Sequence, residues 1–159
     1  MRQIIVDPDP RLRKICKEVT DIDAGIKSLV KELLEMIADR NNNPEKYETG
    51  AVGIAAPQVG ELIQLFVIDT PSFSLTLINP RITKTAGSHR VYESCLSLPG
   101  RMFLVERPKV VKVKGMDIDG NQRTVKLHDF LAQAVIHEMH HLRGILLDNV
   151  AIAEVDGEC

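Results

Sequence analysis

The stretch from Asp129 to Gly144, DFLAQAVIHEMHHLRG, constrains the fold and the chemistry of this chain more than any other. Asp129 is expected to cap a helix and Gly144 to end it, and no proline or glycine lies between them. On that helix His137 and His141 lie one turn apart on one face, with the Glu138 carboxylate beside the first. This is the HExxH arrangement of a catalytic metal site. The motif is short and also arises by chance, so a pair of surface histidines on a polar stripe is the alternative.

The composition predicts a globular protein whose partner is a small ligand or a peptide. The 159 residues predict one domain, 1–159, and 44% hydrophobic residues suffice for a core. The formal charge is −2 with acids and bases interspersed, so no direct nucleic-acid binding is expected, and no apolar run is long enough to span a membrane. The charged N-terminal stretch lacks the apolar core of a signal peptide. Three widely spaced cysteines, Cys16, Cys95 and Cys159, fit reduced thiols, so we expect a cytoplasmic protein.

The remaining sequence predicts one early helix followed by strands. Apolar residues recur from Ile26 to Ile37 with the spacing of an amphipathic helix, and Thr20 or Asp21 is its expected N-cap. The polar stretch DRNNNPEKYETG then reads as a loop. Strands are expected at LIQLFVID, at LTLINP, and in a hairpin whose arms are VVKVKGMDI and RTVKL. The pattern predicts an α+β fold, with antiparallel or mixed sheets packed around the C-terminal HExxH helix.

A catalytic metal site needs a third protein ligand beside two histidines. Glu154 and Glu158 are the candidates downstream, but they lie in a short acidic tail without an evident second helix to hold them. Cys95 lies in the turn-like segment ESCLS and can supply a thiolate. A lone cysteine beside leucines is usually a small buried hydrophobe, so the residue type alone does not decide its role.

Three stretches in this order, GIAAPQVG, ESCLS and HEMHH, resemble the motifs of the peptide deformylase family. The family's versions read roughly G-x-G-x-A-A-x-Q, E-G-C-L-S and H-E-x-x-H. The segments DPDPRLRK, LINP and VKVKGMDIDGN also resemble that family. The resemblance therefore covers nearly the whole chain, from about Asp7 to Asp148.

The resemblance implies a metal-dependent hydrolase that acts on formylated peptide N-termini. Cys95, His137 and His141 are implied to hold one divalent metal ion, with Fe²⁺ favoured in the cell and Zn²⁺ or Ni²⁺ able to substitute. A metal-bound water is implied to attack the formyl group of N-terminal formyl-methionine in new polypeptides. Glu138 is implied to take the proton of that water and to return it to the departing amine.

The resemblance also implies contacts to the reacting group and to the peptide. Gln58 and the backbone N–H of Leu96 are implied donors to the developing oxyanion. Backbone groups of Val52, Gly53 and Ser94 are implied to pair with the substrate as with an added strand.

Several positions depart from the family pattern. Ala51 and Ser94 stand where the family has glycines, which matters if those positions need a positive φ or a close approach of the ligand. His140 replaces the usual aspartate; we expect it to lie beside the ligands, without being one, and to bring no charge. Gln133 shares the metal-facing side of the helix with Phe130, where the family presents apolar residues to the methionine side chain. A polar wall there would shift or relax the preference for methionine, unless Gln133 points past the pocket.

Four functions remain open at this stage. The favoured hypothesis is an active deformylase, and the second is a deformylase-like metal-binding protein with altered substrate preference or little activity on formyl-methionine peptides. A metalloendopeptidase and a metal-stabilised interaction module without catalysis are the others. Because the chain ends soon after LLDNV, without the longer C-terminal helix of many bacterial members, no ribosome contact through such a helix is expected.

Overall fold

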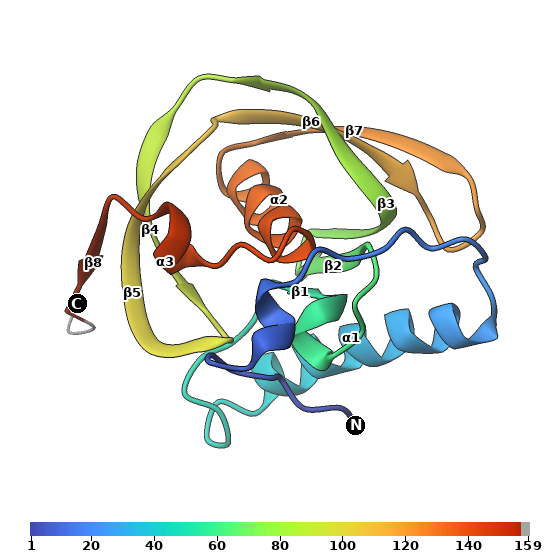
Figure 1. Ribbon diagram of the computed structural model, residues 1–159, viewed down its shortest axis with the longest axis horizontal. Coiled ribbons are helices and arrows are strands. Elements are labelled where there is room, and N and C mark those ends of the chain that lie inside the picture. The colour runs from blue at the N-terminus through green and yellow to red at the C-terminus, as the bar shows by residue number, and fades with distance from the viewer. Residues whose placement is uncertain (157–159) are drawn as a thin grey trace.

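Two antiparallel sheets surround one central helix in the structure, a computed structural model that describes residues 1–156. Helix α2 (Asp129–Leu142) lies in the middle of Figure 1, with β3, β6 and β7 arching over it and β4 and β5 to one side. The predicted α+β class is therefore confirmed. The five-stranded sheet has the order β1 (Gly53–Ala55), β2 (Leu65–Thr70), β3 (Phe73–Ala86), β6 (Val110–Met116), β7 (Gln122–His128). The three-stranded sheet has the order β4 (His89–Cys95), β5 (Leu98–Arg107), β8 (Ala153–Val155).

Helix α2 is held by the apolar inner face of the five-stranded sheet. Val111 and Val113 of β6 point to the same side and are fully buried against Val135 and Met139 of the helix. Burying a side chain of this size stabilises a fold by about 1.5–3 kcal/mol. The apolar side of α2 thus fixes where its polar side, with the histidines, must point.

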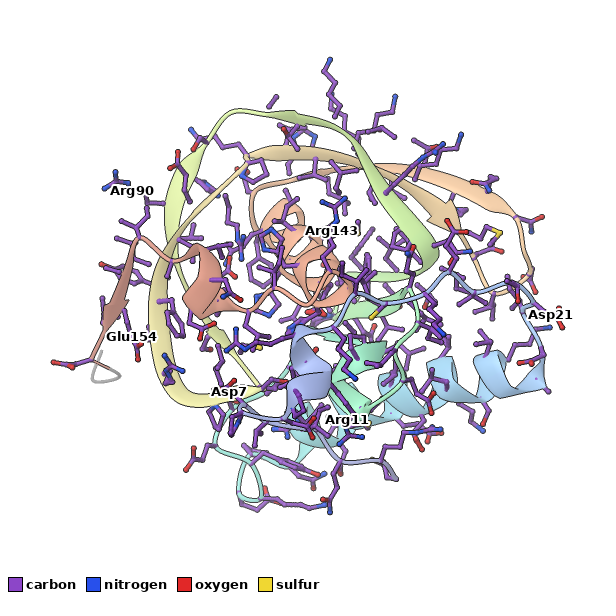
Figure 2. The ribbon with its side chains drawn as sticks, viewed as in Figure 1. Asp7, Arg11, Asp21, Arg90, Arg143 and Glu154 are labelled. Atoms are coloured by element: carbon purple, nitrogen blue, oxygen red, sulfur yellow. The ribbon has the colours of Figure 1, made fainter. Side chains whose placement is uncertain are left out.

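The two ends of α2 differ in how well the sequence predicted them. The helix begins at Asp129 itself, after His128, so the predicted capping role of Asp129 is wrong by one residue. The end is as predicted: Arg143 follows the last helical residue (Figure 2), and Gly144 adopts a φ of 70°. A Cβ on Gly144 would lie 2.4 Å from the carbonyl carbon of Arg13, so the N-terminal segment can cross the helix end only because this residue is glycine.

Helix α1 (Ala24–Asn42) packs against β1 and β2 on the other side of the five-stranded sheet. Its N-cap is Asp23, whose side chain accepts a 2.9 Å hydrogen bond from the Ile26 N–H, so the expected caps Thr20 and Asp21 were wrong. The helix also continues into the polar stretch that was expected to be a loop. No helix among residues 1–156 is both long and apolar enough to cross a membrane. The buried residues of α1 are Leu29, Val30, Leu33, Met36 and Ile37.

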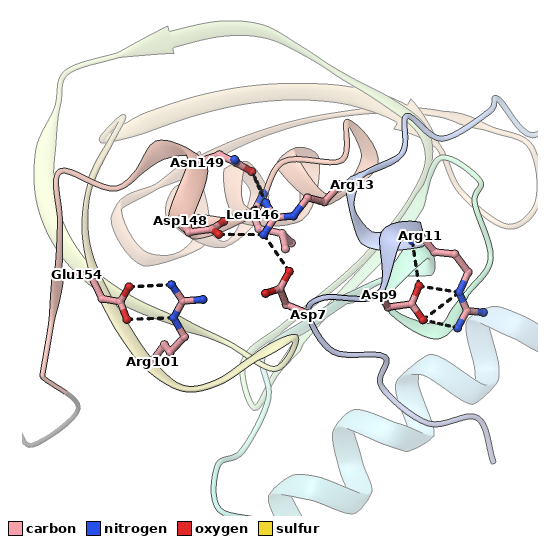
Figure 3. Close-up of polar contacts among 9 residues, drawn as sticks. All are labelled: Asp7, Asp9, Arg11, Arg13, Arg101, Leu146, Asp148, Asn149 and Glu154. Atoms are coloured by element: carbon pink, nitrogen blue, oxygen red, sulfur yellow. Dashed lines mark hydrogen bonds and ion pairs between the residues drawn. The ribbon is translucent and has the colours of Figure 1, made fainter.

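The N-terminal segment is tied to the C-terminal part of the described chain through Arg13, at the end of a 3₁₀ turn (Pro10–Arg13). Its guanidinium donates to Asp148 at 2.9 Å and to Asn149 at 2.9 Å, both in helix α3 (Leu147–Val150). It also donates to Asp7 at 3.0 Å (Figure 3). Exposed pairs of this kind each contribute little stability, but together they fix the position of the segment over the end of α2.

Gly144→Ala should destabilise the protein much more than Gly120→Ala. Both glycines have positive φ, 70° and 81°, but a Cβ on Gly120 meets nothing within 4 Å. We expect a loss of about 1–2 kcal/mol for Gly120→Ala from the left-handed backbone alone, and about 3 kcal/mol or more for Gly144→Ala from strain plus collision with Arg13. Urea denaturation measures both, and equal losses would mean that the contact with Arg13 does not constrain the helix end.

Candidate active site

The second sheet and helix α2 bring Cys95, His137 and His141 together. Cys95 is the last residue of β4, and its Sγ lies 3.4 Å from Nε2 of His141. The Nε2 atoms of His141 and His137 are 3.3 Å apart. One ligand atom from each residue lies within 4.8 Å of the others, and Cys95 and His141 are buried. The cluster therefore unites residues that are 46 positions apart in the sequence.

The geometry of this cluster fits a metal ion. Two ligand atoms bound to zinc at about 2.0–2.3 Å in a tetrahedral arrangement lie about 3.3–3.6 Å apart, close to the distances found here. The donor set, one thiolate and two imidazoles, is typical of zinc and of other first-row transition metals. With three protein ligands a fourth position stays open, as in catalytic sites.

The downstream glutamates do not join the cluster. Glu154 lies on β8 and forms an ion pair with Arg101 of β5 at 2.8 Å (Figure 3), so its carboxylate is engaged there and is not part of the cluster. Glu158 lies outside the described residues, as does Cys159. Among the described residues, Cys95 is the side chain that lies with the two histidines as a third possible metal ligand.

Glu93 and Arg107 form a buried ion pair behind His137. The Arg107 guanidinium binds both carboxylate oxygens of Glu93, at 2.8 and 2.9 Å, and both side chains are nearly inaccessible. Glu93 Oε1 also lies 2.9 Å from Nδ1 of His137. Burial raises the pKa of Glu93, but the hydrogen bonds from Arg107 and His137 outweigh it and bring that pKa to about 2. An ionised Glu93 holds the proton of His137 on Nδ1, which leaves Nε2 facing the cluster with its lone pair.

His140 lies behind the cluster, beside the same arginine. Its Nδ1 is 3.4 Å from a terminal nitrogen of Arg107. Burial and, to a smaller extent, the positive charge of Arg107 lower the pKa of His140 to about 4. The imidazole is therefore neutral near pH 7 and accepts a hydrogen bond from Arg107, in keeping with the sequence-based expectation for this position.

Gln58 is fixed with its amide N–H₂ group toward the cluster. It belongs to a short 3₁₀ helix (Ala56–Val59) that follows β1, and it is 1% exposed. Its Oε1 accepts from the Ala55 N–H at 3.0 Å, which settles the orientation of the amide. Its Nε2 donates to Ser97 Oγ at 3.2 Å and lies 3.8 Å from the Cys95 sulfur.

Glu138 is buried without a partner for one of its oxygens. The side chain is 4% exposed, and Oε2 has no hydrogen-bond partner among residues 1–156. Burial raises the pKa of Glu138 to about 7, against the favourable charge of His137. A Cβ on Gly53 would lie 3.2 Å from this carboxylate, so the glycine is needed for space beside Glu138 rather than for a special backbone conformation.

A cavity of about 280 Å³ opens beside Glu138 and His137. It lies between β1, an outer strand of the first sheet, and β4, an outer strand of the second. Neither Ala51 nor Ser94 has a positive φ, so the replacement of the family's glycines strains neither position. The structure brings every predicted substrate-contact residue to this cavity, whose lining includes Val52, Gly53, Ser94, Leu96, Phe130 and Gln133.

Sequence reasoning missed the roles of Glu93 and Arg107. A histidine that binds a metal through one nitrogen almost always donates from the other to a carboxylate or carbonyl, so a buried acid near His137 was to be expected. Glu93, two residues before Cys95, was the available signal. Arg107 gave no such signal: it lies on β5 opposite His89, while Glu93 is opposite Phe103, and only its long side chain reaches the Glu93 carboxylate.

Comparisons of the sequence and of the structure with known proteins point to the same family over nearly the whole chain. The sequence pattern of a family described as polypeptide deformylase matches residues 1–154. The chain is similar to a peptide deformylase of Alkaliphilus metalliredigens, with 42% identity over 97% of this chain and 99% of the relative. It is also similar to peptide deformylase 1 of Clostridium perfringens, with 39% identity over 92% and 95%. The crystal structure of a peptide deformylase from Thermotoga maritima superposes with a TM-score of 0.82 at 34% identity, covering 96% of this chain and 99% of that one.

Glu138→Gln should stabilise the metal-free protein at alkaline pH. The folded pKa of about 7 lies above the ordinary value of 4.5, so the contribution of Glu138 to stability is complete below pH 4.5 and is lost as the pH rises through 7. We expect the chelator-treated variant to be more stable than the wild type by about 2–3 kcal/mol at pH 8 and to match it at pH 4, as measured by urea denaturation. Equal stability at pH 8 would show that burial does not oppose ionisation of Glu138.

Proposed function

This chain belongs to the peptide deformylase family, and from that premise we propose that it is an active metal-dependent hydrolase that removes the formyl group from N-terminal formyl-methionine of new polypeptides. One observation carries the proposal: the cluster of Cys95, His137 and His141, in which the cysteine and His141 are buried, lies beside a buried carboxylate, Glu138, at the wall of a cavity. A surface pair of histidines, the alternative at the level of the motif, would not be buried against a thiol and a second carboxylate.

We assign Cys95 Sγ and the Nε2 atoms of His137 and His141 as the metal ligands. The hydrogen bond from His137 Nδ1 to Glu93 supports this, because it leaves Nε2 for the ion. We propose Fe²⁺ in the cell, with Zn²⁺ or Ni²⁺ able to substitute, since a thiolate with two imidazoles suits all three. When bound, such an ion lowers the pKa of a coordinated water toward neutrality and polarises a carbonyl oxygen.

Glu138 is proposed to move the proton. Its unpartnered Oε2 can accept a proton from the attacking water, and the C–N bond of the formamide then breaks as the same carboxyl group donates that proton to the amine nitrogen. The products are formate and a free N-terminal amine. Its burial supports this role, because a carboxylate with a raised pKa is a stronger base than an exposed one.

Gln58 and Leu96 are proposed to stabilise the formyl oxygen as it gains charge. The Gln58 amide is held rigidly by Ala55 and Ser97, with its donor group toward the cluster, so little reorganisation is needed when charge develops. Leu96 follows Cys95 in the turn after β4 and lines the same cavity, and its backbone N–H is the second proposed donor.

The peptide is proposed to bind as an added strand between the two sheets. In the part of the chain that the structure describes, β1 pairs only with β2 and β4 pairs only with β5, so each has an edge without a strand partner. Backbone groups of Val52, Gly53 and Ser94 can pair with an extended peptide there. The methionine side chain would then enter the cavity beside Phe130 and Gln133.

The second candidate is the same fold with an altered substrate preference. Gln133 lines the cavity, so a polar group stands where an apolar methionine side chain is expected to pack.

We retain the cytoplasm as the expected location, and the free thiols of Cys16 and Cys95 support it. We also propose that residues 1–159 form one domain, since both sheets and α2 contribute to a single cavity.

Formate release from formyl-Met-Ala-Ser tests the proposed function. The protein should be prepared without oxygen and loaded with Fe²⁺ or Ni²⁺. We expect turnover by the wild type and a fall in kcat of about 10²–10⁴-fold in Glu138→Gln, because an amide cannot accept the proton of the water. Metal content, measured in both proteins, should be the same.

Other outcomes of this assay separate the alternatives. Full metal content with no turnover by the wild type would overturn the deformylase proposal for this substrate. Cleavage inside an acetylated peptide that has no formyl group would indicate an endopeptidase. An inactive wild-type protein with one ion per chain and unaltered peptide binding in Glu138→Gln would indicate a metal-stabilised interaction module.

Gln133→Leu should increase the preference for methionine at the first position. We expect kcat/KM for formyl-Met-Ala-Ser to rise about 3–10-fold relative to that for formyl-Gln-Ala-Ser, because the leucine removes a polar group from the cavity wall and adds apolar contact. Gln122→Leu, on an exposed position of β7, is the matched control. An unchanged ratio of the two substrates would mean that Gln133 points past the methionine side chain.

A further inference from the structure

One side chain of helix α1 holds the backbone that leads into β1. Asn41 lies in the last turn of α1, and its Nδ2 donates to the Ala51 carbonyl oxygen at 2.8 Å. Its Oδ1 accepts from the Ala51 N–H at 2.9 Å. A single amide therefore binds both backbone groups of Ala51, as a neighbouring strand would. We call this pair of hydrogen bonds the Asn41–Ala51 contact.

The Asn41–Ala51 contact lies where β1 loses its strand partner. Gly53 still pairs with β2, and the Val52 carbonyl accepts a 2.8 Å hydrogen bond from the Asp69 N–H. The chain then bends at Val52, and no strand of the described chain pairs with Ala51. The mostly exposed loop after α1 swings out below this helix and returns to β1 (Figure 1). The hydrogen bonds of Asn41 thus continue those of β2.

Two side-chain amides hold the free edge of β1 from both ends. Neighbouring residues of a strand direct their backbone groups to opposite sides, and Val52 directs its carbonyl to β2. The backbone groups of Gly53 therefore point to the free edge. On one side of Gly53 the Ala55 N–H donates to the Gln58 side chain at 3.0 Å. On the other side lies the Asn41–Ala51 contact.

The segment held by Asn41 is a wall of the cavity beside Glu138. Its residues from Gly50 to Gly53 all line this cavity. In the proposed function an extended peptide pairs with backbone groups of Val52 and Gly53. The affinity of an added strand comes largely from main-chain hydrogen bonds, so a displaced edge would bind the peptide more weakly.

Gly50 is a glycine because of this contact. A Cβ at this position would lie 2.5 Å from Asn41 Oδ1, and apart from this side chain it meets nothing within 4 Å. The φ of Gly50 is not positive, so its backbone conformation is open to other residues. An alanine here would therefore displace the Asn41 side chain and little else.

The stability of α1 does not account for Asn41. Asparagine is among the less favourable residues of a helix interior. The C-cap of α1 is Asn43, whose side chain donates to the Asp39 carbonyl oxygen at 2.9 Å and to the Asp39 carboxylate at 2.8 Å. The end of the helix is thus closed without Asn41. The side chain of Asn41 serves the segment that leads into β1.

We propose that Asn41 is a positioning residue for peptide binding, which fixes the free edge of β1 where Val52 and Gly53 pair with the substrate. The proposal rests on the peptide-binding mode given under the proposed function, and not on hydrolysis itself. Asn41 does not line the cavity and touches no reacting group. Its loss should therefore weaken binding and raise KM, with kcat unchanged.

Binding of formyl-Met-Ala-Ser to Ni²⁺-loaded Glu138→Gln protein, measured by titration calorimetry, tests the proposal without cleavage of the peptide. Adding Asn41→Ala should raise the Kd about 3–10-fold, as expected when a main-chain hydrogen bond is weakened. Alanine is favourable in a helix, so α1 should persist. Asn43→Ala is the matched control, because it removes an amide that bonds only within α1, and it should leave the Kd unchanged.

Gly50→Ala tests the same contact from the other side. We expect it to raise the Kd by a similar factor, and adding it to Asn41→Ala should raise the Kd no further, because the two residues share one contact. Amide hydrogen exchange at Ala51 should be at least about tenfold faster in Asn41→Ala than in Asn43→Ala. With Glu138 intact, kcat for formate release should be the same in Asn41→Ala and Asn43→Ala.

Equal Kd values in Asn41→Ala and Asn43→Ala would overturn the proposal, even if the wild type releases formate. Additive increases from Asn41→Ala and Gly50→Ala would overturn it as well, because they would place the two residues in separate contacts. Failure of the metal-loaded wild type to release formate, with the expected changes in Kd, would refute the proposed hydrolysis and support the role of Asn41.

Discussion

The buried ion pair of Glu93 and Arg107 connects the parts of this protein that must meet for a site to exist. Glu93 lies on β4, Arg107 on β5, and the Glu93 carboxylate reaches His137 on α2. Removing one member of a buried pair leaves the other charge without compensation, typically at about 3–5 kcal/mol. The contact that holds the second sheet to the central helix is therefore also the contact that orients a proposed metal ligand. Fold stability and site geometry depend here on the same three side chains.

The site also concentrates features that oppose stability. Glu138 is buried with an unpartnered oxygen among the described residues. The cavity beside it lies between β1 and β4, each the edge strand of its sheet. Each feature is unfavourable for an isolated fold and useful for a hydrolase, since a carboxylate with a raised pKa accepts protons well and a free strand edge can pair with a peptide. The apolar packing of α2 against the first sheet offsets these features and keeps the polar side of the helix in place.

The sequence predicted what local spacing determines and missed side-chain contacts that form only in the folded chain. The helix, its glycine end and the two histidines follow from a periodic pattern, and the family motifs singled out Cys95, which the structure brings beside them. The segment ESCLS was described as turn-like, whereas its first three residues are the end of strand β4. Glu93 and Arg107 are not paired in the register of β4 and β5, so their contact depends on the reach of the Arg107 side chain in the folded protein, which residue spacing does not specify. Gly53 was named only for its backbone groups, whereas the structure shows that a side chain there would lack room beside Glu138.

The separation of the cluster's members along the chain affects how the protein folds. Two of them, His137 and His141, become neighbours as soon as one helix forms, whereas Cys95 is 46 residues from His141 and arrives only when the second sheet docks. Closing a loop of that length has an entropic cost that local structure does not repay, so the complete cluster belongs to a late stage of folding. An ion that binds all three side chains selects the fully assembled chain over every partly folded form, and the native state gains stability in proportion to the logarithm of the ion's concentration above its Kd. The supply of metal in the cell would then control the lifetime of the folded protein as well as its chemistry.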